Sequence, residues 1–161
     1  TGAAGLADLS AALSRPVGGG QKGQAALLAH AAPGAPQLFA GGLHIVPHAD
    51  GTVAVGSTSE RTWQDPAATD AALDGLVARA RRICPALQDA AVIARWAGLR
   101  PRAASRAPML GPWPGRAGHF IANGGFKTGF GMAPGVAEAM ADLLIDGADR
   151  IPEGLRIGAS L

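Results

Sequence analysis

The apolar residues of this chain follow a helical spacing in three segments. We predict helices over residues 5–14, from Asp65-Pro66 to Ile83, and from Pro134 to about Gly147. Their apolar faces comprise, in chain order, Leu6, Leu9 and Leu13; Leu73, Leu76, Val77 and Ala80; and Val136, Met140, Leu143 and Leu144. Pro16 and Pro85 end the first two helices, because proline cannot continue the hydrogen-bond ladder, and Gly147 is a typical C-terminal stop.

Short β-rich segments lie between these helices. Residues 43–46 and 52–57 flank a connection that contains Asp50-Gly51, a dipeptide typical of hairpins. Further strands are expected within residues 18–30, 90–99 and 119–123. Residues 100–115 are rich in proline and are interpreted as a surface connection. This order of elements predicts an α+β fold with an antiparallel or mixed sheet.

The composition is that of a globular chain of ordinary domain size. The chain has 161 residues, 48% of them hydrophobic, and no apolar run is long enough to predict a membrane span. The first residues show no signal-peptide pattern. The net charge is +2, and the basic residues form no dense patch interleaved with aromatic ones, so we expect no nucleic-acid binding.

Cysteine and histidine point to no metal chemistry. Cys84 is the single cysteine, which excludes an internal disulfide and a cysteine-based zinc site. It is consistent with a reducing compartment, and we expect a cytoplasmic location. His44 and His48 are four residues apart, but Pro47 between them argues against a helical pair that binds a metal ion. We therefore expect no metal site.

The segment NGGFKTGFGMAP, residues 123–134, is the strongest candidate for a ligand site. Its four glycines, Gly124, Gly125, Gly129 and Gly131, allow the backbone to approach a ligand closely. The amides at the start of a following helix favour negative charge, and Pro134 suits a first helical turn. The alternative is a tight strand-to-helix turn that binds nothing, and the residues alone leave both interpretations open.

A second candidate is Arg100 in the segment WAGLRP, residues 96–101. An arginine held between a strand and a proline presents a planar fork that matches a carboxylate or a phosphate. The alternative is an ordinary surface charge.

Five segments in this order resemble the C-terminal half of the D-amino-acid oxidase and glycine oxidase-like family of FAD-dependent oxidoreductases. They are TGAAGL (1–6), GGGQKGQAALL (18–28), HIVPHADGTVAVGSTSE (44–60), WAGLRPR (96–102) and NGGFKTGFGMAP (123–134). The resemblance implies a substrate domain built on an antiparallel sheet and interleaved with a dinucleotide-binding domain. It assigns residues 1–11 to the end of the FAD-binding domain, 12–95 to the substrate-binding domain, and 96–161 to the return to the FAD-binding domain. It also implies FAD as cofactor and oxidation of an amine or amino acid to an imine.

The same resemblance suggests roles for individual residues. Arg100 matches the arginine that pairs with the substrate carboxylate, and Lys127 stands where related sequences often have a second arginine near that carboxylate. These two are the predicted catalytic residues. The predicted cofactor-binding residues are Gly98, Gly124, Gly125, Phe126, Lys127, Thr128 and Gly129. The helix near Pro134 would direct its N-terminus toward the flavin's N1 and C2 carbonyl, where fixed amides stabilise negative charge.

Three features depart from the family pattern. The family's FAD-anchoring GxGxxG is absent, since Pro134 stands where the last glycine after Gly129 and Gly131 would be. The chain also has no tyrosine, which such enzymes commonly place in the substrate pocket. Finally, Gly125 and Lys127 replace a common histidine and arginine.

From the missing motif we expect this chain to be the C-terminal portion of the enzyme and to be inactive by itself. The FAD-binding half would come from the same gene product or from a partner chain. Two other interpretations remain: a non-catalytic scaffold module that binds a partner chain or a small anion, and a soluble α+β protein of unrelated function.

Overall fold

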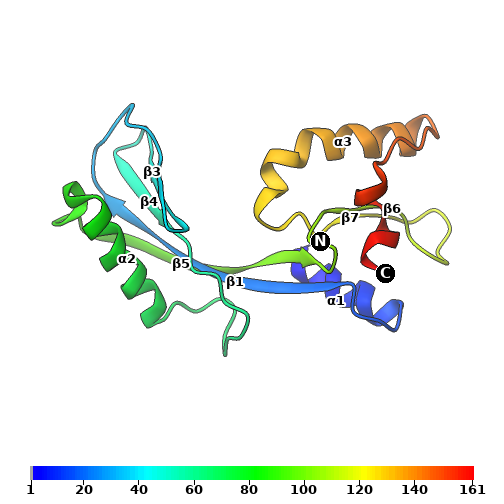
Figure 1. Ribbon diagram of the computed structural model, residues 1–161, viewed down its shortest axis with the longest axis horizontal. Coiled ribbons are helices and arrows are strands. Elements are labelled where there is room, and N and C mark those ends of the chain that lie inside the picture. The colour runs from blue at the N-terminus through cyan, green and yellow to red at the C-terminus, as the bar shows by residue number, and fades with distance from the viewer. Residues whose placement is uncertain (1) are drawn as a thin grey trace. The chain divides into compact units, whose positions relative to one another are not determined.

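Residues distant in the sequence make up one of the two folded units of this chain. A computed structural model describes residues 2–161. Its contacts separate unit 1, Thr1–Gln21 with Arg100–Leu161, from unit 2, Lys22–Leu99. Each unit has hydrophobic core residues of its own. The chain passes from one unit to the other within β1 and again within β5 (Figure 1).

A five-stranded sheet forms the centre of unit 2. Its strands are β1 (Gly18–Ala29), β2 (Leu38–Ala40), β3 (Leu43–Pro47), β4 (Thr52–Gly56) and β5 (Val92–Ala103), in the spatial order β2-β3-β4-β1-β5. Strands β3 and β4 pair antiparallel with Ile45 opposite Val55, and β4 pairs antiparallel with β1. The predicted hairpin and the α+β class with an antiparallel sheet are therefore confirmed.

The helix α2 (Ala71–Ile83) covers this sheet with the predicted apolar face. Leu73, Val77 and Ala80 are buried, and they pack with core residues of β1, β3 and β4. The predicted start at residues 65–66 is wrong, because Asp70 caps the helix by accepting a hydrogen bond from the Ala72 amide. A short 3-10 turn, Pro85–Leu87, follows the helix.

A buried polar network joins β1 to the start of α2. The Gln24 side chain is fully buried, and its amide donates to carboxylate oxygens of Glu60 at 3.0 Å and Asp70 at 2.8 Å. Its carbonyl accepts from the Asp70 backbone amide at 2.9 Å. The buried Lys22 ammonium lies 3.8 Å from Glu60 and 3.5 Å from Asp70. The two carboxylates thus compensate the one buried cation, and Gln24 orients both.

The Asp70 carboxylate in this network predicts a pH-dependent stability. The Gln24 amide, and then the Ala72 amide, hold its pKa below the ordinary value of 3.8. The stability it contributes is therefore fully present above that value and is lost as the pH falls through the lower pKa of the folded state. Asp70→Asn retains a capping side chain but no charge, so the thermal midpoints of wild type and variant should converge below pH 3.8. A difference that stays constant from about pH 7 to about pH 3 contradicts this assignment.

Unit 1 combines helices with a separate two-stranded sheet (Figure 1). Its elements are α1 (Gly2–Ala12), β6 (Met109–Pro112), β7 (Phe120–Asn123) and α3 (Gly129–Ile145), with 3-10 turns at Phe126–Thr128, Glu153–Leu155 and Ile157–Ser160. Leu6 and Leu9 of α1 pack with Met109 and Ile121 of the sheet. Met140 of α3 packs in a second cluster that includes Leu110 of β6.

The interpretation of residues 100–115 as a surface connection is wrong. Strand β5 continues to Ala103, and Met109–Pro112 forms β6, paired antiparallel with β7. Met109 and Leu110 are buried. The flanking prolines are compatible with a strand here because each lies at or beyond an end of the short pairing.

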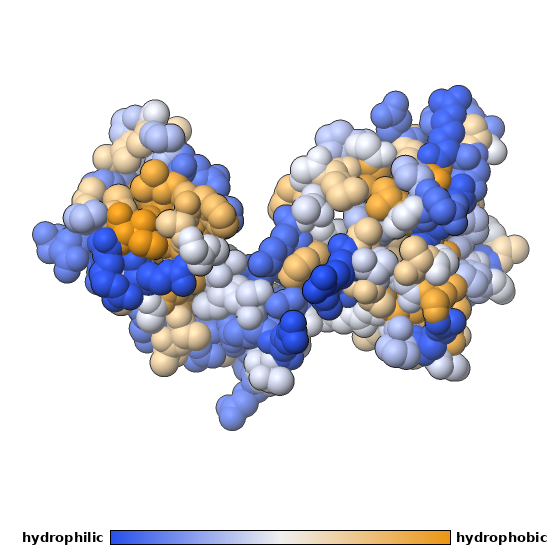
Figure 2. Space-filling model, in the orientation of Figure 1, coloured by the Kyte–Doolittle hydropathy of each residue, from blue (hydrophilic) through white to orange (hydrophobic). Residues whose placement is uncertain are grey.

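The start of α3 also differs from the prediction. The helix begins at Gly129, five residues before Pro134, which therefore lies inside it. Proline has no amide to donate, so the carbonyl of Phe130 lacks its partner one turn later. Phe130, Leu144 and Ile145 are exposed, so Leu144 is not part of the buried stripe. Hydrophobic surface is visible along this helix in Figure 2.

Membrane and metal sites are not found in residues 2–161. None of the helices described there combines the length and apolar character needed to span a bilayer. No group of three or more histidine, cysteine or acidic side chains in that range is arranged to hold a metal ion.

Candidate functional site

The loop between β7 and α3 needs glycine at two positions for steric reasons. Gly124 has φ +82°, and a Cβ atom placed there would lie 2.7 Å from the Cβ of Ala103. A Cβ atom on Gly125 would lie 2.9 Å from the Cα of Gly129. Nothing lies within 4 Å of a Cβ built on Gly129 or Gly131. Packing of the loop therefore accounts for the first two glycines, and the other two leave the start of α3 open.

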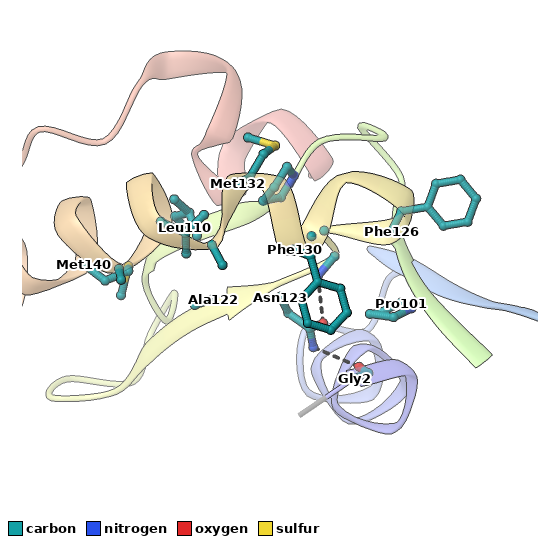
Figure 3. Close-up of a pocket in the computed structure, with 16 residues that line it drawn as sticks. Gly2, Pro101, Leu110, Ala122, Asn123, Phe126, Phe130, Met132 and Met140 are labelled. Carbon is teal, nitrogen blue, oxygen red and sulfur yellow. Dashed lines mark hydrogen bonds between the residues drawn. The ribbon is translucent and has the colours of Figure 1, made fainter. Parts of the chain in front are cut away.

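Two contacts hold this loop against the rest of unit 1. The Asn123 side-chain amide donates to the Gly2 carbonyl at 2.9 Å, and its carbonyl accepts from the Gly124 amide at 2.7 Å (Figure 3). On the other side, Arg102 of β5 forms an antiparallel bridge with Gly125. The loop backbone is thus fixed by α1 and by β5.

The 3-10 turn Phe126–Thr128 leads directly into α3. Phe126 has φ +47°, a left-handed conformation that is strained for a bulky residue and often marks functional loops. The Thr128 hydroxyl donates to the Gly125 carbonyl at 3.1 Å. It does not cap α3, and no other side chain does so at Thr128, so α3 follows directly on the 3-10 turn without a side-chain cap.

An apolar cavity of about 540 Å³ opens beside this loop. Of the predicted cofactor-binding residues, Gly124, Gly125, Phe126 and Gly129 line it, while Lys127 and Thr128 are exposed and do not. Leu110, Met132 and Met140 also line it, and Figure 3 labels all three. A largely apolar space with backbone amides at one side suits a flat aromatic ring that carries polar atoms along one edge.

Two predicted site residues lie on β5: Arg100, predicted to bind the substrate, and Gly98, predicted to bind the cofactor. Arg100 is half-buried on this strand, and Pro101, the next residue, lines the cavity. Because side chains alternate along a strand, Arg100 and Arg102 share the face opposite Pro101. Gly98 is exposed and belongs to unit 2.

Sequence reasoning missed two residues of this site. Arg102 and Asn123 received no role, although both contact the loop. The alternation of Arg100 with Arg102 in β5 is a signal that the sequence did contain. The bond from Asn123 to Gly2 spans 121 residues and leaves no local pattern.

Residues 1–143 match the profile of the family described as FAD dependent oxidoreductase. The chain belongs to this family. All five segments that carried the resemblance lie within the matched region. FAD, the cofactor expected from the sequence, is the cofactor of this family.

Individual relatives agree with this assignment. The chain is 38% identical over 144 residues to the glycine oxidase of Pseudomonas putida, covering 85% of this chain and 39% of that protein. The glycine oxidase of Pseudomonas aeruginosa is 36% identical over 140 residues, with 83% and 38% covered. The crystal structure of glycine oxidase from Geobacillus kaustophilus superimposes with a TM-score of 0.84 at 26% identity, covering 98% of this chain and 43% of that one. The chain therefore spans about two fifths of the length of these relatives.

Proposed function

We propose that this chain supplies the substrate-binding and flavin-facing part of an FAD-dependent enzyme that oxidises an amine or amino acid, of the glycine or D-amino-acid kind, to an imine. The observation that carries the proposal is the apolar cavity lined by Gly124, Gly125, Phe126 and Gly129, the loop at which the family resemblance places the flavin. The glycine oxidases to which the chain is similar support the substrate class.

The residues of this loop fit a flavin ring. FAD, when bound, accepts the electrons and hydrogen removed from the substrate carbon and nitrogen. Gly124 and Gly125 line the cavity, and close packing against Ala103 and Gly129 holds their backbone in place there. The uncapped amides at the start of α3 favour negative charge at the adjacent ring edge, and the fixed loop supplies them without reorganisation. Arg100 is proposed to hold the substrate carboxylate and thereby orient the reacting carbon, with Lys127 nearby.

The proposal also assigns each segment of the chain to a domain. Residues 12–95 form the substrate-binding domain, and residues 1–11 and 96–161 belong to the FAD-binding domain. The remaining FAD-binding half, with its dinucleotide motif, is supplied by the same gene product or by a partner chain. We place the assembled enzyme in the cytoplasm, in keeping with the free Cys84.

Arg100→Ala tests the carboxylate role in the enzyme assembled with its FAD-binding half. A charge-assisted pair contributes about 2 kcal/mol, so the KM for an amino-acid substrate should rise about thirtyfold. The KM for a matched amine without the carboxylate should rise far less. Steady-state kinetics on both substrates, with Arg100→Lys retaining part of the effect, measure this difference.

Equal losses on the two substrates would remove Arg100 from substrate binding. Absence of turnover by wild type with every amine and amino acid, despite bound FAD, would favour the non-catalytic scaffold instead. That alternative explains the packing of Gly124 and Gly125 equally well, and a bound partner chain would cover the apolar cavity beside them, so turnover is the measurement that separates the two functions.

A further inference from the structure

We propose that a second cavity, within unit 2, binds a small phenol, that is, a single aromatic ring with one hydroxyl group. The cavity has a volume of about 270 Å³. All of its lining residues lie within Lys22–Leu99, so it is separate from the β7–α3 loop of unit 1. The inference goes beyond the proposed function and does not depend on it.

Two hydrogen-bonded turns contribute to the walls of this cavity. The connection between β1 and β2 supplies Ala32, Ala35 and Pro36, and the Ala35 amide donates to the Ala32 carbonyl at 3.1 Å. The turn that follows α2 supplies Cys84 and Leu87, and the Leu87 amide donates to the Cys84 carbonyl at 3.0 Å. Because each turn is closed by its own backbone bond, the cavity is formed before a ligand enters, and binding costs little reorganisation.

The size and the apolar lining of the cavity suit one ring. Ile45 of β3, Val53 of β4 and Leu87 are at most 3% exposed, whereas Leu38 and Ala86 line the cavity from the exposed surface. The volume is above the about 150 Å³ that admits benzene and below the about 300–1,000 Å³ of pockets for drug-sized ligands. A single ring with a small substituent therefore fits, and its burial removes apolar surface from water.

His30 supplies the polar group that selects a hydroxyl. Its half-buried side chain lines the cavity and forms no hydrogen bond or ion pair within residues 2–161. The other three histidines each have a partner at 2.7–3.1 Å: Gln37 for His44, Thr52 for His48 and the Ala117 carbonyl for His119. A neutral imidazole has one donor and one acceptor nitrogen, and a hydroxyl, which both donates and accepts, can satisfy either. The Cys84 thiol, a weak donor, is the other polar side chain of the lining.

The experiment titrates the FAD-loaded enzyme, with both halves present, with phenol and with toluene, which lacks the hydroxyl. Both probes should shift the methyl NMR signals of Ile45 and Val53. His30→Leu should weaken phenol binding about tenfold relative to toluene binding, because only phenol loses a hydrogen bond. Ala86→Trp places an indole at the exposed rim and should weaken both probes at least about tenfold. Ala78→Trp is the matched control, since Ala78 is exposed in the same unit but does not line the cavity, and it should bind both probes as wild type does.

Cys84 gives a second readout, because its half-buried thiol lines the same cavity. Phenol at about ten times its Kd should slow the alkylation of Cys84 by iodoacetamide about tenfold, as measured by mass spectrometry of the peptide that contains it. Methyl signals that do not respond to phenol, or an alkylation rate that phenol leaves unchanged, overturn the inference.

The variants can also contradict it. Equal losses of phenol and toluene in His30→Leu exclude the hydrogen bond to His30 and with it the phenol class. Undiminished binding in folded Ala86→Trp places the probes elsewhere and is equally decisive against the site. None of these results bears on amine oxidation, so the proposed function is tested separately by the kinetics of Arg100→Ala.

Discussion

Gly124→Ala is expected to lower the free energy of unfolding by about 3 kcal/mol. About 1 kcal/mol comes from placing a side chain at φ +82°, and a further 1–3 kcal/mol comes from forcing the new Cβ to within 2.7 Å of the Ala103 Cβ. Ala103 cannot rotate away, because it is fully buried and its Cβ is fixed to the backbone of β5. Chemical denaturation measures the change.

Gly118→Ala separates the two contributions. Gly118 belongs to the same unit and has φ +73°, but nothing lies within 4 Å of a Cβ built there. Its substitution should therefore cost only about 1 kcal/mol. Equal costs at the two positions would mean that the close approach of the loop to β5 is not what requires glycine at residue 124.

Gln24→Leu should destabilise unit 2 by about 3 kcal/mol. Leucine fills most of the space, but it leaves the backbone amide of Asp70 and the facing oxygens of Asp70 and Glu60 without the partners that lie 2.8–3.0 Å away in wild type. Buried polar groups that lose their partners cost about 1–3 kcal/mol each, and water can reach part of this network to offset the sum. Denaturant titration, followed by a probe in unit 2, gives the value.

Gln37→Leu provides the same chemical change without burial. The Gln37 amide contacts His44 at 2.7 Å, but this pair is exposed, so water replaces the lost bond and the stability should change by less than about 0.5 kcal/mol. A loss below about 1 kcal/mol for Gln24→Leu would mean that the network contributes little and that the introduced leucine packs without penalty.

The spacing of apolar residues predicted the helices and the hairpin, because the residues that face the core must recur at the period of the helix or strand. Leu6 and Leu9, or Leu73 and Val77, recur at helical spacing because they must face one core. The strand at Met109–Pro112 escaped prediction, since prolines at its edges signal a break although its centre is buried. The start of α3 was misplaced for a related reason: Pro134 is typical of a first turn, whereas the tertiary contacts of the loop start the helix at Gly129.

The candidate site was only partly predictable for a different reason. The density of glycine identifies the loop, because positive φ angles and close backbone contacts both favour glycine in the sequence. The residues that contact the loop from elsewhere in the chain have no comparable signal in the composition. Arg102 reaches Phe126, and Asn123 reaches Gly2, through contacts between segments that are far apart in the chain. A single sequence carries no local pattern for such contacts, so these residues emerged only from the structure.

The interrupted path of unit 1 sets an order for biosynthesis. Unit 2 is one continuous segment, so all of its core residues are synthesised before the second segment of unit 1, which starts at Arg100. The hydrogen bond from Asn123 to Gly2 must wait until 121 further residues have been added to the nascent chain, and closing so long a loop is entropically costly. We expect the sheet of unit 2 to fold before residues 123–145 are synthesised, so the loop after β7 and α3 pack into unit 1 only later.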